Sequence, residues 1–200
     1  MKYDSEYFIA REAGSGASYM LQESDDSGVN ERMLKADYPI THRVTGIGKV
    51  EIQEGNKRKF QPCDYHETPD PLVSKRFKEI VEKFKPKKVD FYPTEITNGK
   101  KVWADHYYIH MYNEYAAVHP TRSIYDGDIV NDEMIIVDNL SLNEDVLDKI
   151  PLEDRLIFVL VEDWIQLWHK SIVDAVVEAG MTGVKFKRVD SWNIGSSFED

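Results

Sequence analysis

The stretch "SIVDAVVEAGMTGVKFKRV", residues 171–189, predicts a helix, a turn and a strand in immediate succession. Ser171 suits the N-cap of the helix, and Gly180 suits the left-handed residue at which a helix ends. After Gly183, apolar and basic residues alternate, which is typical of a half-buried strand. Four apolar residues recur at helical spacing, Ile172, Val173, Val176 and Val177, and of these we expect Val176 and Val177 to be buried.

The glycines at 180 and 183 also raise the alternative of a phosphate-binding loop. Such a loop precedes a helix, because the anion needs the free N–H groups of a helix N-terminus. Here the glycines follow the helix. The sequence therefore favours a helix-turn-strand connection, in which Gly183 is structural.

The rest of the chain predicts an α+β fold with a mixed, mostly antiparallel sheet, two amphipathic helices and a β-rich N-terminal part. The second helix is expected at "DPLVSKRFKEIVEKF", residues 70–84, with Phe77 and Ile80 buried. We expect a β-rich N-terminal subdomain at 1–68 and an α+β region at 69–200. Strand-like segments lie at residues 6–10, 17–22, 49–54, 89–96, 101–113, 134–140 and 155–161.

Composition indicates a globular protein, with 42% hydrophobic and 30% charged residues in 200. The longest strongly apolar run, residues 156–161, is far shorter than a membrane span. Cys63 is the only cysteine, which excludes an internal disulfide and fits a reducing compartment. Asp4 and Glu6 stand where a secretory signal would be apolar, so a cytoplasmic protein without membrane contact is expected.

The net charge of −11 is unevenly distributed. Residues 126–163 hold twelve acids and two bases, a local charge of −10, whereas residues 75–101 carry +5. The overall sign disfavours direct binding of nucleic acid and favours a basic protein partner. A solvated acidic face is the alternative. The candidate partner-binding residues are Asp126, Asp128, Asp132, Glu133, Glu144, Asp145 and Asp148.

Histidines supply the best candidate for a metal site. His106 and His110 are four residues apart in "DHYYIH", and Cys63 and His66 in "CDYH" offer a second pair. These side chains are the ligand types that zinc prefers. Histidines that are simply packed among tyrosines are the alternative, and we predict no cofactor and no catalytic motif.

From residue 107 onwards, the order of segments resembles a family of bacterial polymorphic-toxin immunity proteins, immunity family eleven, once a domain of unknown function. A tyrosine-rich strand, an apolar strand, an "IF" strand, a helix, and a "GVKF" strand follow in the family's order. "EYAAVHP", residues 114–120, departs from the pattern, since the family usually carries an aspartate there. The matching residues are Val73, Ser74, Phe91, Pro93, Tyr107, Tyr108, Asn113, Ser123, Ile157, Phe158, Ser171, Gly183, Val184 and Phe186.

This resemblance implies a non-enzymatic, cytosolic immunity protein of interbacterial competition, which binds a cognate toxin and neutralises it by occlusion. The matching positions are mostly structural, so the resemblance transfers no binding residue. A metal-binding domain or enzyme using His106 and His110 is the alternative function. An oligomeric scaffold protein of the same fold is a third possibility.

Overall fold

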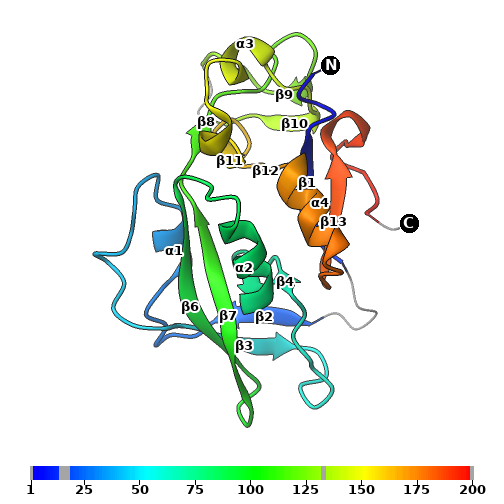
Figure 1. Cartoon of the computed structure of the whole chain (residues 1–200). Coiled ribbons are helices and arrows are strands. Elements are labelled where there is room, and N and C mark those ends of the chain that lie inside the picture. Colours follow the sequence, from blue (N-terminus) through cyan, green and yellow to red (C-terminus); the bar gives the residue numbers. More distant parts are fainter. Residues whose placement is uncertain (1, 14–18, 132–133, 199–200) are drawn as a thin grey trace.

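The computed structural model describes residues 2–13, 19–131 and 134–198. The fold is α+β, rich in strands, with two main sheets and a small separate hairpin (Figure 1). Most neighbouring strands are antiparallel, and the two parallel pairs are β3 with β6 and β8 with β11. The predicted fold class is therefore confirmed. No helix among these residues has the length and apolar character needed to cross a membrane.

The larger sheet has six strands in the order β2-β3-β6-β7-β5-β4. Its longest element is the hairpin of β6 and β7, whose register shifts between Thr94 and Ile96. This hairpin occupies the lower part of Figure 1. The strands are β2 (Met20–Glu23), β3 (Gly48–Glu54), β4 (Tyr65–His66), β5 (Leu72–Ser74), β6 (Val89–Thr97) and β7 (Val102–Met111).

The second sheet has five strands in the order β13-β1-β12-β11-β8, and β9 pairs with β10 beside it. Both main sheets draw strands from either side of residue 68, because β1 joins the second sheet and β5 to β7 join the first. The strands are β1 (Tyr7–Glu12), β8 (Glu114–Tyr115), β9 (Ile124–Asp126), β10 (Ile136–Asn139), β11 (Ile157–Leu160), β12 (Gln166–His169) and β13 (Val184–Arg188).

Two longer helices, α2 and α4, lie next to each other between the two main sheets (Figure 1). Their buried faces meet in one apolar cluster, in which Phe77 of α2 packs edge-on against Trp168 of β12, with the ring centroids 6.0 Å apart. The helical elements are α1 (Glu31–Leu34), α2 (Lys75–Glu82), α3 (Glu144–Leu147), α4 (Lys170–Glu178) and the 3₁₀ turns η1 (Leu152–Asp154) and η2 (Val189–Ser191).

The start of α2 differs from the prediction. The helix begins at Lys75, after Ser74, whose hydroxyl accepts a hydrogen bond from the backbone of Phe77. The preceding residues, Leu72–Ser74, form β5 and pair with β7, so tertiary pairing overrides the helical pattern there. Phe77 and Ile80 are buried as predicted.

The start of α4 also differs, because His169 and not Ser171 is the N-cap. The His169 side chain accepts a hydrogen bond from the backbone N–H of Ser171. Val176 is fully buried, but Val177 is 64% exposed, so its predicted burial is wrong. The elements packed against α4 therefore cover a narrower strip of the helix surface than its apolar pattern predicts.

The connection from α4 to β13 is the predicted turn. Gly180 and Gly183 have left-handed backbones, with φ of 63° and 81°. Gly183 also passes close to the segment before β4. A Cβ atom at this position would lie 2.3 Å from the Cys63 Sγ and 2.5 Å from the Tyr65 carbonyl oxygen. Only glycine satisfies both the backbone angle and the close approach.

Candidate functional site

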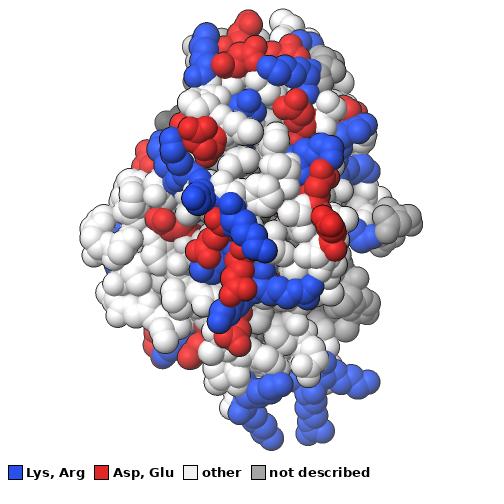
Figure 2. Space-filling view, viewed as in Figure 1, with Lys and Arg blue, Asp and Glu red and all other residues white. Residues whose placement is uncertain are grey.

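The acidic segment lies at the upper end of the molecule, around α3 and the β9–β10 hairpin (Figures 1 and 2). Asp126 ends β9 and is exposed, Glu144 and Asp145 form the first turn of α3, and Asp148 follows that helix. Asp128 accepts hydrogen bonds from the Asn131 amide and the Val130 backbone. The other two candidates, Asp132 and Glu133, lie outside the described residues.

Two of these carboxylates are bound to basic groups of the same chain. Glu144 lies 3.3 Å from Arg122 and accepts a hydrogen bond from the Lys2 backbone. Asp148 accepts hydrogen bonds from the Lys2 ammonium, at 2.6 Å, and the Tyr3 hydroxyl, at 2.5 Å. These bonds hold the pKa of both carboxyls below its usual range. Glu144 and Asp148 therefore already anchor the N-terminal segment.

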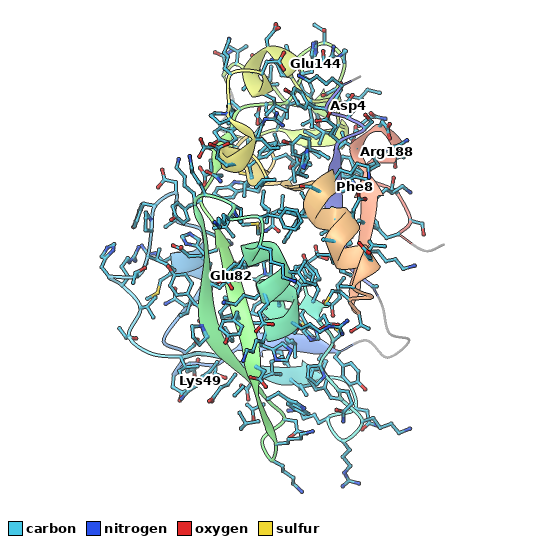
Figure 3. The ribbon with its side chains drawn as sticks, viewed as in Figure 1. Asp4, Phe8, Lys49, Glu82, Glu144 and Arg188 are labelled. Atoms are coloured by element: carbon cyan, nitrogen blue, oxygen red, sulfur yellow. The ribbon has the colours of Figure 1, made fainter. Side chains whose placement is uncertain are left out.

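Asp4 is the buried part of the same anchor. It is 2% exposed and accepts hydrogen bonds from the Ser141 hydroxyl, at 2.9 Å, and the Leu142 backbone, at 2.8 Å. Figure 3 shows Asp4 and Glu144 at the same end of the molecule. The acidic segment is thus partly structural, and its role in partner binding stays a prediction.

His106 and His110 both lie on β7 and are buried, but they bind different backbone carbonyls. The His106 Nε2 lies 3.3 Å from the Cys63 oxygen, and the His110 Nε2 lies 2.8 Å from the Ala36 oxygen. Burial lowers the pKa of both imidazoles. These contacts are typical of packed histidines, and the alternative in which the two act as metal ligands has no support in the described part of the chain.

Within the described residues, the one group spaced for a metal ion is Cys63, His66 and Glu12. The His66 Nδ1 lies 3.6 Å from the Cys63 sulfur and 3.2 Å from the Glu12 carboxylate. Burial lowers the pKa of His66, but the hydrogen bonds with Cys63 and Glu12 outweigh it and raise the pKa to about 9. A metal ion at this group would compete with a proton for the His66 ring.

A cavity of about 520 Å³ lies between the two main sheets, and we call it the inter-sheet cavity. Its walls come from α1, the loop before β5, β7, the segment before β10, β11 and β12. Most of the wall is apolar. Its residues are Leu34, Lys35, Asp70, Ile109, Met111, Met134, Val159, Trp164 and Gln166.

Trp164 stands at this cavity in the turn between β11 and β12. Its side chain is 45% exposed and its φ is 52°. A left-handed backbone is unfavourable for a bulky residue, by about 1 kcal/mol or more. Met134, which also lines the cavity, is 52% exposed. Two large apolar side chains that line the cavity are therefore also exposed to solvent.

Asp70 supplies the negative charge of the inter-sheet cavity. Its Oδ2 is buried and has no hydrogen-bond partner among the described residues, and the same holds for the Tyr108 hydroxyl. Burial and the nearby Glu31 raise the pKa of Asp70 to about 7. Burial and the charge of Asp70 also raise the pKa of Tyr108. An unpaired buried carboxylate destabilises the free protein.

Sequence reasoning missed Asp70, Trp164 and Glu12. Asp70, in "TPDP", lies at the start of the segment for which the sequence predicts a helix, and Trp164 lies in "VEDWIQLW", where large apolar residues are frequent. Glu12 joins Cys63 only through the pairing of distant segments. The local sequence around Trp164 and Glu12 carries no signal for these positions, whereas Pro-Asp-Pro could have indicated a loop.

The comparison with known families matches residues 50–191 to an immunity protein family, Imm11. The match covers more than half of the chain, and it starts at β3, earlier than the resemblance predicted from the sequence. No curated protein matches the chain. The resemblance is therefore confirmed, and the chain belongs to the Imm11 immunity protein family.

Proposed function

We propose that this protein binds a cognate bacterial toxin and neutralises it by occlusion, in the cytoplasm of the cell that makes both. The observation that carries the proposal is the family match over residues 50–191. Occlusion needs a complementary surface and no catalytic group of its own. The toxin then acts on an intracellular target, in competition between bacteria.

We further propose that the toxin is basic and approaches the acidic end of the molecule. Clustered carboxylates attract a basic partner over distances of about 10 Å at 0.1 M salt, and so raise the association rate. Asp126 and Asp145 suit this role best, because Glu144 and Asp148 already bind Arg122 and Lys2.

The first experiment tests neutralisation itself. Candidate toxin domains, taken first from reading frames beside this gene, are expressed in a susceptible cell with and without this protein, and growth is measured. We expect growth only in the presence of the protein and a stable complex of the two purified chains. A purified pair that forms no complex would refute the proposal.

The second experiment tests the electrostatic part. Asp126→Asn with Asp145→Asn should slow association at low salt and leave dissociation nearly unchanged. The matched control is Glu51→Gln with Glu54→Gln, which removes two exposed charges from β3. Docking at the acidic end would be contradicted if both double variants change the association rate equally, or if salt does not affect that rate.

A further inference from the structure

The inter-sheet cavity carries an inference about the partner, which rests on the proposed function. We propose that the cavity receives one arginine side chain of the toxin, with the guanidinium against Asp70 and Trp164. The carboxylate of Asp70 would be the counter-ion, and the apolar wall would enclose the methylene groups. None of the described acidic partner-binding candidates lines this cavity, so it is a contact site separate from theirs.

The charge around Asp70 favours a cation. Besides Asp70, the carboxylates of Glu31 and Glu23 act on this position, against the single ammonium of Lys35. Lys35 is ion-paired with Glu31, four residues earlier, so these two charges largely cancel and those of Asp70 and Glu23 remain. Asp70 lines the cavity and keeps one oxygen without a hydrogen-bond partner among the described residues. A guanidinium, which carries several N–H donors, would pair with this carboxylate.

The shape of the opening favours arginine over lysine. The exposed Trp164 offers an aromatic face, on which the planar guanidinium stacks well. Ile109 and Met111 of β7 supply apolar wall for a long aliphatic stem. Guanidinium is also more weakly hydrated than ammonium, so it enters a half-buried site at lower cost.

Both key residues adopt energetically unfavourable states in the unbound protein. Trp164 has a left-handed backbone, and burial raises the pKa of the Asp70 carboxyl to about 7. Residues of this kind persist where binding compensates for the cost. A bound guanidinium would pair with the ionised form of Asp70, so complex formation should release a proton near neutral pH.

The main experiment measures the affinity of the toxin domain identified by the neutralisation experiment for four forms of the full chain. Asp70→Asn and Trp164→Ala should each weaken binding about tenfold or more, as expected for central contacts. Glu51→Gln, an exposed site on β3, should leave binding unchanged. Wild-type affinity should rise about tenfold from pH 6 to pH 8, and Asp70→Asn should abolish that rise.

A second measurement does not need the toxin. N-acetyl-arginine amide is titrated into the protein while the Trp164 indole N–H resonance is followed, with the citrulline analogue as the neutral control. We expect a shift with the arginine probe that Asp70→Asn removes. No shift, or an equal shift with citrulline, overturns the proposal, and a larger shift with the lysine analogue overturns the choice of arginine.

The outcomes separate the two proposals. If the wild type and both cavity variants bind the toxin equally, the cavity proposal fails and the immunity function stands. If the arginine probe shifts the indole but no toxin complex forms, the immunity function fails and the cavity chemistry stands. Asp70→Asn should be at least as stable as the wild type at pH 8, so misfolding would not explain a loss of binding.

Discussion

Gly183 meets two demands at a single position, a left-handed backbone and a close approach to Cys63 and the Tyr65 carbonyl. Gly183→Ala should therefore lower the free energy of unfolding by about 1 kcal/mol for the backbone and about 1 to 3 kcal/mol more for the collision. Gly99→Ala is the matched control, because its φ is 83° but nothing lies within 4 Å of the added Cβ.

Denaturant unfolding of both variants measures the difference directly. The free energy of unfolding of the control should fall only by the backbone contribution, about 1 kcal/mol. An equal fall in both variants would show that the close approach to Cys63 does not affect stability. The toxin complex should survive Gly183→Ala at temperatures where the variant is folded.

His66 makes stability depend on pH in a direction that its pKa fixes. Its folded pKa of about 9 lies above its usual value of 6.5, so its contribution is fully present below pH 6.5 and is lost as the pH rises through 9. The loss should be on the order of 3 kcal/mol, at about 1.4 kcal/mol per pKa unit. Unfolding free energies measured across this window test the expectation.

Glu12→Gln provides the comparison, because it removes the carboxylate that lies 3.2 Å from the His66 ring. The decline across the same window should become smaller in this variant. A wild type whose stability is constant from about pH 6.5 to 9 would contradict a charged His66.

At the scale of elements, α2 and α4 share the same apolar spacing, but one residue of that spacing is buried in α2 and another is exposed in α4. Phe77 is fully buried between Tyr65 and Trp168, whereas Val177 of α4 is mostly exposed. Phe77→Ala should cost about 3 to 5 kcal/mol, and Val177→Ala should stay within about 0.5 kcal/mol. Thermal unfolding of both variants checks this, and comparable shifts would contradict the observed packing.

Elements whose pattern is local were predictable from the sequence, and their ends were not. The 3.6-residue spacing in α4 and the alternation after Gly183 depend only on neighbouring residues. The start of α2 depends on β5 pairing with β7, about 34 residues away, and the cap of α4 depends on the His169 side chain. The inter-sheet cavity needs Asp70 and Trp164 together, which no local pattern can indicate.

At the scale of the whole molecule, the first strand joins distant parts of the chain. β1 pairs with both β12 and β13, and Asp4 binds residues 141 and 142. A fragment of residues 69–200 would lack an interior strand of one sheet and β3 of the other. We expect it not to fold alone, and the full chain to unfold in one transition.

Circular dichroism and calorimetry of the two fragments, 1–68 and 69–200, check this expectation. The predicted division at residue 68 would gain support if the longer fragment unfolds cooperatively. Recovery of a cooperative transition only after the fragments are mixed would indicate a single folding unit.

The two ends of the molecule differ in charge. Opposite the acidic end, basic side chains project from the loop after β3 and the tip of the β6–β7 hairpin (Figure 2), and Asn98 holds the two loops together through the Lys57 carbonyl, at 3.0 Å. The exposed bases are Lys57, Arg58, Lys59, Lys100 and Lys101. This separation gives the protein a large electric dipole moment. In dilute salt, molecules that meet head to tail should therefore repel each other less than their shared charge of −11 implies, and light scattering measures that difference.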